Sequence, residues 1–225
     1  MEIEQNPYGL KNIVLFGLSG SGKDTIANEL EVQADYFKIR IAGTIKQIIQ
    51  EKHNFSENEL EEAKRTRPEI REEHHIIGNY LDSFNATINR VKMIINGKVT
   101  DFKYKQDYQA VVVCDGRGLE REVKLFLEQP DWVCIFLSRN NYDTEYKNDN
   151  HWTEAGSIEN SLKFIEENKF HEKSIIIINN KKEYKLSDEY NKIAEKCLGY
   201  FNISKNSSSS NLLNIIKHCI TEELI

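Results

Sequence analysis

The sequence predicts an α/β fold of three layers, in which helices cover both faces of a mostly parallel, five-stranded sheet. Short apolar runs alternate along the chain with segments whose apolar residues recur at helical spacing. The apolar runs are continuous instead of alternating with polar residues, which is typical of strands buried on both faces. The length of 225 residues and the hydrophobic content of 39% are sufficient for such a core.

The five expected strands are the apolar runs at Lys11–Phe16, Tyr36–Ile41, Ala110–Cys114, Trp132–Leu137 and Ser174–Ile178. Helical spacing follows three of these strands, with apolar positions at Ile45, Ile48 and Ile49, at Leu119, Val123, Phe126 and Leu127, and at Ile158, Leu162 and Ile165. Strands thus alternate with helices, which implies a mostly parallel sheet joined by crossover connections.

Three segments depart from this alternation within what we expect to be one domain, residues 1–225. Residues 44–109 are long, charged and without an obvious central strand, so they predict a helical insertion. Residues 140–156 are very polar and predict a surface loop or lid. The serine-rich stretch 204–211 predicts a flexible linker before a last amphipathic helix.

The composition excludes several classes of function. The chain carries 30 Lys and Arg against 36 Asp and Glu, a net charge of −6, which argues against a general binder of nucleic acid or anionic membranes. No apolar run approaches the roughly 18 to 20 residues of a membrane span, and no signal peptide is apparent. The four cysteines form no CxxC pair, so neither a zinc site nor a disulfide scaffold is indicated, and a cytoplasmic location is expected.

A glycine-rich segment, GLSGSGKDT at residues 17–25, lies between the first expected strand and a helical pattern. Glycines let successive backbone N–H groups converge on a phosphate, and the following helix adds the positive end of its dipole. Lys23 is placed to reach the β- and γ-phosphates of a nucleotide. The segment therefore predicts ATP binding by Ser19, Gly20, Ser21, Gly22, Lys23, Asp24 and Thr25.

The position after the lysine departs from the common phosphate-loop pattern. Asp24 stands where Ser or Thr normally holds Mg²⁺, and Thr25 follows it. Either Thr25 takes over part of that role, or phosphates and water hold the metal while Asp24 orients a bound water. Asp115, directly after the third apolar run, is a second candidate for holding Mg²⁺ through water, and the alternative is that it caps the turn after the strand.

Several arginines follow the expected strands, where parallel sheets build their sites. Arg117 and Arg139 come after the third and fourth strands, and Arg67 and Arg71 flank the start of a helix in the insertion. Such cations offset the repulsion between two phosphate groups during phosphoryl transfer. A phosphate monoester has a second pKa of about 6, so as acceptor it needs no general base. We interpret Arg65, Arg90 and Arg121 as solvated surface charges or helix-face ion pairs, and His74 and His75 as surface or helix-packing residues.

Four segments together resemble the deoxynucleoside-monophosphate kinases of tailed bacteriophages, within the P-loop nucleoside-monophosphate kinase group. They are SGSGKDT at Ser19–Thr25, IAGTIK at Ile41–Lys46, CDGRGLERE at Cys114–Glu122 and NDNHWTEAG at Asn148–Gly156. The resemblance spreads over most of residues 11–180. Residues 181–210 and the arginine pattern KRTRPEIREEHH depart from the family, which bears on acceptor specificity more than on the fold.

The resemblance implies roles for individual residues. Lys46 contacts the acceptor nucleotide, and Gly78 closes on it. The acceptor pocket is lined by Asp115, Arg117 and Glu120. Glu122 is a competing match to the family glutamate, because the spacing after Arg117 is one residue off. Arg139 and the lid residues close over the phosphates, and Glu154 is expected to hold an arginine in place. These lid residues are His151, Thr153 and Glu154.

The expected reaction is Mg²⁺-dependent transfer of the ATP γ-phosphoryl group to a deoxynucleoside monophosphate, with Lys23, Arg117 and Arg139 as catalytic residues. One rival is a P-loop kinase of another small acceptor, such as phosphomevalonate or dephospho-coenzyme A. A second rival is a module that binds ATP without catalysis. No nucleic-acid or membrane partner is expected, and a homodimer remains open.

Overall fold

The computed structural model describes residues 11–17, 21–34, 36–83, 85–96, 110–116, 120–140, 158–180, 186–204, 214 and 216. Within these, the side chains of residues 139, 140, 179, 180 and 202–204 are not described. The chain forms two compact units. Unit 1 comprises Met1–Ile39 and Phe102–Ile225, and unit 2 comprises Arg40–Asp101.

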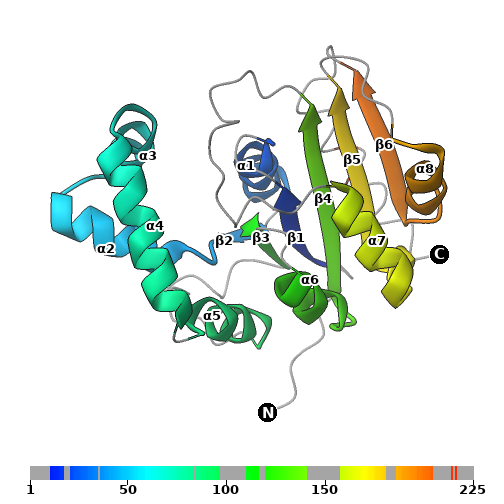
Figure 1. The fold of residues 1–225 in the computed structure, drawn as a ribbon, viewed down its shortest axis with the longest axis horizontal. Helices are drawn as coiled ribbons and strands as arrows, with labels where there is room; N and C mark the ends of the chain where they lie inside the picture. Colours follow the sequence, from blue (N-terminus) through cyan, green and yellow to red (C-terminus); the bar gives the residue numbers. More distant parts are fainter. Residues whose placement is uncertain are drawn as a thin grey trace. The chain divides into compact units, whose positions relative to one another are not determined.

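Unit 1 is built on a six-stranded, all-parallel sheet (Figure 1). Its order is β2-β3-β1-β4-β5-β6, which places β1 between β3 and β4. The strands are β1 Asn12–Gly17, β2 Tyr36–Ile39, β3 Ala110–Gly116, β4 Trp132–Asn140, β5 Ser174–Asn180 and β6 Gly199–Ser204. The predicted α/β class and parallel sheet are confirmed. The sheet has one strand more than predicted, because β6 forms within the stretch at 181–210 that the sequence marked only as an extra segment.

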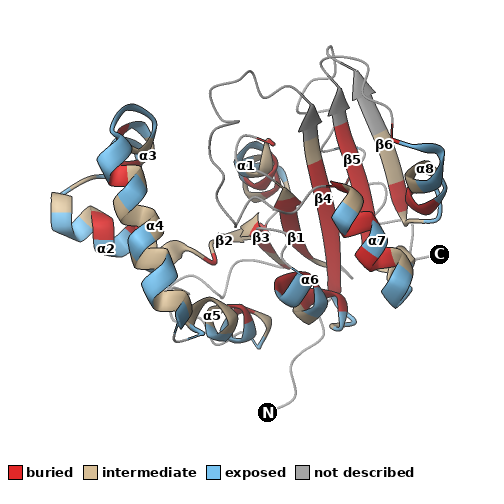
Figure 2. Ribbon diagram, in the orientation of Figure 1, coloured by how far each residue is buried: buried red, intermediate tan, exposed pale blue. Residues whose placement is uncertain are grey.

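The three layers follow from the alternation of side chains along β1. Ile13 and Leu15 share a buried cluster with Ile26, Ala27 and Leu30 of helix α1, Lys23–Gln33. On the other face, the Phe16 ring lies 6.1 Å from that of Phe126 in helix α6, Glu120–Leu127. Helix α7, Ile158–Asn168, covers the same face as α6, opposite α1 (Figure 1). The sheet is therefore buried on both sides, as its continuous apolar runs predict (Figure 2).

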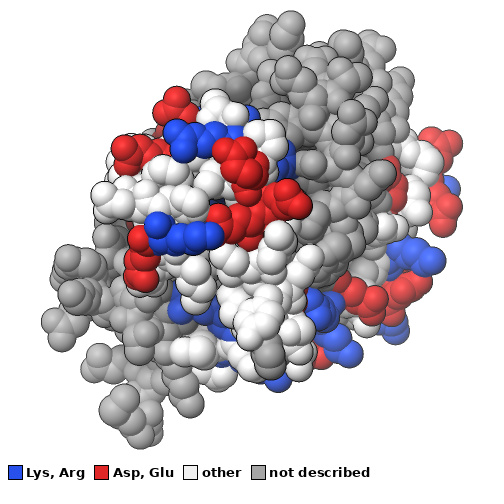
Figure 3. Space-filling model, turned by 60° about the vertical axis from the view of Figure 1, so that its left-hand side comes forward, with Lys and Arg blue, Asp and Glu red and all other residues white. Residues whose placement is uncertain are grey.

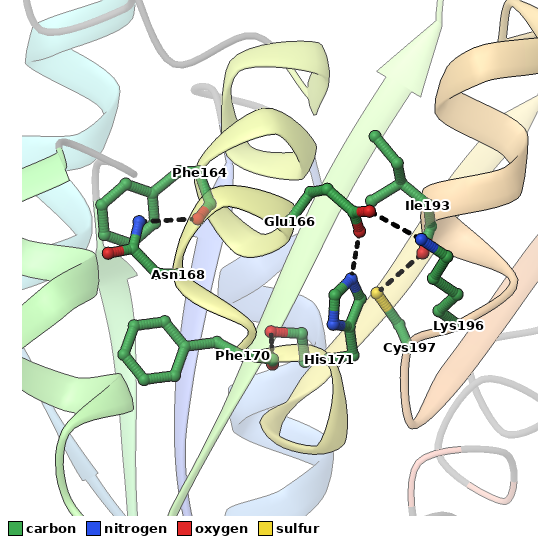
Figure 4. A network of polar contacts seen from close by, with 9 residues as sticks. Phe164, Glu166, Asn168, Phe170, His171, Ile193, Lys196 and Cys197 are labelled. Atoms are coloured by element: carbon green, nitrogen blue, oxygen red, sulfur yellow. Dashed lines mark hydrogen bonds and ion pairs between the residues drawn. The ribbon is translucent and has the colours of Figure 1, made fainter.

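An ionic network joins the elements near β5 and β6 (Figure 4). Glu166 of α7 lies 2.6 Å from His171 Nε2 of the 3₁₀ helix η2, His171–Lys173. The same carboxylate accepts a hydrogen bond of 2.6 Å from Lys196 Nζ, just after helix α8, Asp188–Ala194. These two hydrogen bonds lower the pKa of Glu166. Because the Glu166 carboxylate is exposed to solvent, we assign this network a structural role in joining helices instead of a role in binding or catalysis.

Unit 2 consists of four helices, so the helical insertion predicted at 44–109 has helices where it is described. They are α2 Gly43–His53, α3 Glu57–Thr66, α4 Pro68–Ser83 and α5 Ala86–Ile95. A capping box between Ser56 and Glu59 begins α3, and Pro68 occupies the first position of α4, where its missing N–H has no cost. One buried cluster of this unit is formed by Ile49, Leu60, Ala63 and Ile70, and Val91 and Ile94 of α5 are buried as well.

The surface carries mixed charges. On the face shown in Figure 3, basic and acidic side chains lie among one another instead of forming a field of one sign. In the described part of the chain, no helix is both long enough and apolar enough to cross a membrane. None of the described cysteines forms a disulfide, and Cys114 and Cys134 are buried in the sheet. The predicted linker and last helix lie largely outside the described residues, although Ile216 is helical and fully buried against the sheet core.

Candidate functional site

The turn that leaves β1 depends on glycine at its two described ends. Gly17 has φ +151°, and a Cβ atom there would lie 2.4 Å from the carbonyl oxygen of Leu137 on β4. Gly22, with φ +103°, adopts the left-handed conformation directly before α1. The chain can therefore turn sharply from the centre of the sheet into a helix, which is the geometry that the phosphate-loop pattern predicts.

Three polar features meet at this turn. Lys23 is the first residue of α1, and its Nζ donates a hydrogen bond back to the carbonyl oxygen of Gly17. Ser21 is 4% exposed, and its Oγ has no hydrogen-bond partner among the described residues. Gly22 supplies no side-chain cap to the N-terminus of α1. A cation, a buried hydroxyl and an uncapped helix N-terminus together suit an anion such as a nucleotide phosphate.

The acidic candidates divide by exposure. Asp115 lies near the end of β3, the neighbour of β1, and Gly116 is paired with Phe16. On α6, Glu120 is exposed, whereas Glu122 is fully buried. The two glutamates that match the family segment thus point to different environments. Glu122, the competing match, is the one that the fold directs inward.

The oxygen donors near the loop fit Mg²⁺ chemically. Thr25 offers a hydroxyl in the first turn of α1, and Asp115 offers a carboxylate on the strand beside β1. Mg²⁺ prefers oxygen ligands and keeps several waters, so it needs only one or two protein ligands beside the nucleotide phosphates. Across the described ranges, no cluster of three or more His, Cys, Asp or Glu is present that would hold a metal by protein ligands alone. The donor set agrees with a metal brought in with the nucleotide.

The structure distributes the acceptor candidates of unit 2 over two helices. Lys46 on α2 is 8% exposed, and its Nζ donates to Glu61 of α3. Arg67 is exposed, with its guanidinium 5.7 Å from the centre of the Phe55 ring. Arg71 on α4 is partly buried. Gly78 also lies on α4, where an added Cβ would contact Ile45 Cδ1 at 3.5 Å.

The sequence does not predict four further charged or titratable residues of unit 2 as site residues. Glu61 and Lys64 are spaced as an ordinary surface pair on a helix, Arg90 is interpreted as a surface charge or helix-face ion pair, and His74 as a surface or helix-packing residue. In the structure, His74 Nε2 is buried and lacks a hydrogen-bond partner within the described residues. Burial lowers the pKa of His74 to about 3, and the charge of Lys64 contributes further. The only sequence signal for these residues is that they lie on amphipathic helices, one face of which is expected to be buried.

Several predicted site residues lie outside the described residues. They are Ser19 and Gly20 of the loop, Arg117, and the lid residues His151, Thr153 and Glu154. Arg139 is described only through its backbone, at the end of β4. Asp24 is described and is exposed in the first turn of α1.

Comparisons with known proteins identify no family. No protein-family model matches the chain, and no curated protein is significantly similar to it. Among solved structures, a shikimate kinase from Acinetobacter baumannii in complex with shikimate aligns with 13% identity and a TM-score of 0.36. That alignment covers 97% of this chain and 97% of the other. Because a TM-score this low does not establish a common fold, the α/β assignment depends on the sheet order and the turn after β1.

Proposed function

We propose that the protein transfers the γ-phosphoryl group of ATP to a deoxynucleoside monophosphate, giving the diphosphate and ADP. The observation that carries this proposal is the turn after β1. There Lys23 presents a cation beside the N-terminus of α1, and Ser21 presents a buried hydroxyl that has no hydrogen-bond partner among the described residues. The identity of the acceptor is supported by the four segments that resemble the phage kinases.

In this proposal, unit 1 holds the donor. The Lys23 ammonium exchanges the carbonyl of Gly17 for phosphate oxygens of ATP, which are stronger, charged acceptors. An oxygen of the acceptor phosphate attacks the γ-phosphorus, and the bond to the β–γ bridging oxygen breaks as ADP leaves. When bound, Mg²⁺ neutralises charge on the transferred phosphates, and Thr25 and Asp115 are the residues that would hold it, directly or through water.

Arg117 and Arg139 are proposed to be the cations that stabilise charge during transfer. The segment 140–156 is proposed to be a lid that excludes water from the reacting groups. Lys46 is proposed to contact the acceptor, together with Arg67 or Arg71 and Gly78. Asp115 and an acidic residue of α6 are proposed to line the acceptor pocket. For α6, the burial of Glu122 makes it a better candidate than the exposed Glu120.

The test is ADP release with ATP and Mg²⁺ across a panel of deoxy- and ribonucleoside monophosphates, with a blank that lacks acceptor. We expect acceptor-dependent release with one or more deoxynucleotides. Release equal to the blank for every nucleotide rejects this acceptor class, and the same assay with phosphomevalonate and dephospho-coenzyme A then tests the rival kinases. If ATP binds but no acceptor increases release, the protein is a binding module.

Two variants assign the activity to the turn after β1. Lys23→Ala is expected to lower turnover by about a thousandfold, because the lysine charge stabilises the transferred phosphates. Lys163→Ala is the matched control, since its side chain is 68% exposed on α7 and pairs only loosely with Glu167 at 3.9 Å. Equal turnover in both variants, with both folded by circular dichroism, would remove Lys23 from the donor site.

A further inference from the structure

Unit 2 gathers three cations into a partly buried group, which we name the cationic cluster: Arg40, Lys46 and Lys64. Their side chains are only 17%, 10% and 24% exposed. The carboxylates that pair with them are more accessible, at 59% for Glu57 and 37% for Glu61. Positive charge is therefore held deeper than the carboxylates that pair with it. Cations removed from water are stable only with an anion beside them.

Glu61 is the centre of the cationic cluster. Its Oε1 accepts a hydrogen bond from Lys46 Nζ, and the same oxygen lies 3.6 Å from Lys64 Nζ. One carboxylate oxygen thus serves two ammonium groups that come from different helices, α2 and α3. Two lysines converging on one oxygen is also how a phosphate oxygen is bound. Because Glu61 is the more exposed partner, its carboxylate can leave toward water while the lysines stay in place.

His74 adds an unused hydrogen-bonding atom to the same region. Its Nε2 is buried and has no partner within the part of the chain that is described. His74 lies on α4, which packs against both α2 and α3, and the charges of Lys64, Lys46 and Glu61 act on its imidazole. A buried nitrogen without a partner is costly in a folded protein and is commonly satisfied by a ligand or water. A neutral imidazole can donate one hydrogen bond to an anion from this atom.

A second arginine borders the region. An added Cβ at Gly43, the first residue of α2, would lie 3.6 Å from Arg90 Nη2 and 3.9 Å from Arg40 Cβ. Both arginines therefore stand beside the N-terminus of α2, which has no side-chain cap and no acidic residue in its first turn. Glu57 lies 3.1 Å from Arg40 and is the anion that the structure places beside these cations.

We infer that unit 2 contains an anion subsite formed by Lys46, Lys64 and His74, and that Glu61 occupies it until a phosphate-monoester dianion displaces the Glu61 carboxylate. The built-in carboxylate sets a threshold for the ligand. A dianion interacts with the two ammonium groups more strongly than Glu61 does, whereas a monoanion of similar size gains nothing over it. Glu61 is then a specificity-determining residue for doubly charged ligands. The inference uses the proposed function only to name the acceptor phosphate as the natural ligand.

The experiment measures binding of inorganic phosphate to the full-length Lys23→Ala protein by calorimetry, without ATP or Mg²⁺. The Lys23→Ala background weakens phosphate binding at the turn after β1. In this background, Glu61→Gln is expected to tighten phosphate binding by about tenfold, because the internal competitor loses its charge. Lys64→Met is expected to weaken it by about tenfold or more, because one charge-assisted contact is lost.

Matched controls come from the same helix. Glu62→Gln and Arg65→Met alter exposed residues of α3 next to the two test positions, and both are expected to leave the phosphate affinity unchanged. Acetate, a monoanion, is expected to bind at least about tenfold more weakly than phosphate to the protein that retains Glu61. If Glu61→Gln disturbs folding, the ¹³C signal of the Glu61 carboxylate provides a second readout, since phosphate should shift it toward that of a solvated carboxylate.

Weaker phosphate binding in Glu61→Gln would overturn the inference, because Glu61 would then position the lysines instead of competing with the ligand. Unchanged binding in all four variants would also overturn it, since phosphate would bind elsewhere. Neither result depends on turnover, because the experiment measures phosphate binding in the absence of ATP. Conversely, failure of the nucleotide panel with the unaltered protein would reject the proposed reaction while leaving this subsite to be decided by the binding data.

Discussion

The two units differ in where they place charged side chains. Unit 1 keeps most of them at its surface, whereas unit 2 holds several of them away from water. In unit 1, the fully buried side chains of the sheet and its covering helices are mostly apolar, and the Glu166 network lies at an accessible edge. In unit 2, Lys46, Lys64 and His74 are largely removed from water, on helices that also carry a buried apolar cluster. Because buried charge costs free energy, unit 2 gives up stability for an electrostatic environment.

The largest expected effect would break unit 1 at its central turn. Gly17→Ala places a Cβ 2.4 Å from the Leu137 carbonyl oxygen at a residue with φ +151°, where side chains are strained. We expect a loss of about 3 kcal/mol or more in the free energy of unfolding, because the nearest atoms belong to the backbone of Leu137 in β4, which cannot move aside like a flexible side chain, and the Ser21 Oγ would lie at 2.8 Å. Chemical denaturation measures this loss. A variant as stable as the parent protein would show that β1 and β4 separate easily at this point.

The second prediction concerns how the stability of unit 2 depends on pH through the buried His74. The pKa of His74 falls from 6.5 to about 3 on folding, mainly through burial. The unfolded chain therefore binds a proton between these values that the folded unit does not, so stability is lost as the pH falls below about 6.5. We expect a decrease of about 1 to 3 kcal/mol by pH 4.5. The charged groups that face this imidazole are Lys64, Glu61, Lys46 and His75.

Hydrogen exchange at several pH values measures this decrease in the helices of unit 2 separately from the sheet of unit 1. The pKa values of Glu61 and Glu73 are lowered, so the stability that these carboxylates contribute is lost at more acidic pH than that of His74. His74→Leu is expected to abolish the decrease between pH 6.5 and 4.5. A decrease of the same size in that variant would assign the effect to another group.

A smaller effect is expected where a cation of unit 1 acts on the backbone. Lys173 Nζ donates to the carbonyl oxygens of Leu127 and Gln129, both at 3.0 Å, and so satisfies the C-terminal end of α6. Lys173→Met is expected to cost about 1 to 2 kcal/mol, because these carbonyls lose a charged donor. Thermal unfolding of this variant and of Lys163→Met compares a partly buried lysine with an exposed one. Identical melting temperatures would show that the hydrogen bonds from Lys173 to the end of α6 do not contribute to stability.

The smallest expected effect has the opposite sign and lies in unit 2. Gly78 is inside α4, and an added Cβ would meet Ile45 Cδ1 at an ordinary 3.5 Å. Gly78→Ala is expected to stabilise the unit by about 0.5 to 1 kcal/mol, because alanine favours a helix over glycine. If the family role of Gly78 applies, the KM for the acceptor rises while stability increases. A less stable variant would mean that α2 and α4 pack more tightly than the contact at Ile45 indicates.

The sequence by itself determined the positions of five strands and the turn after β1. Continuous apolar runs are a local pattern, and each is bounded in the structure within a few residues of its prediction, as at Ala110–Gly116 and Ser174–Asn180. The glycines of GLSGSGKDT are also local, because they are required by the backbone of their own turn. β6 was missed because its residues, GYFNIS, join the sheet only through their register with β5.

Only the tertiary structure decided which charged residues lie together in unit 2. Glu61 and Lys64 are three residues apart, a spacing that on its own describes a solvated helix face, and Lys46 is fifteen residues earlier. Packing of α2 and α3 against α4, the helix of His74, largely removes Lys46 and Lys64 from water, whereas Glu61 stays partly exposed. The physical reason is that a charge's surroundings depend on which helices pack against it, whereas a strand's apolar content and a turn's glycines are properties of the segment itself.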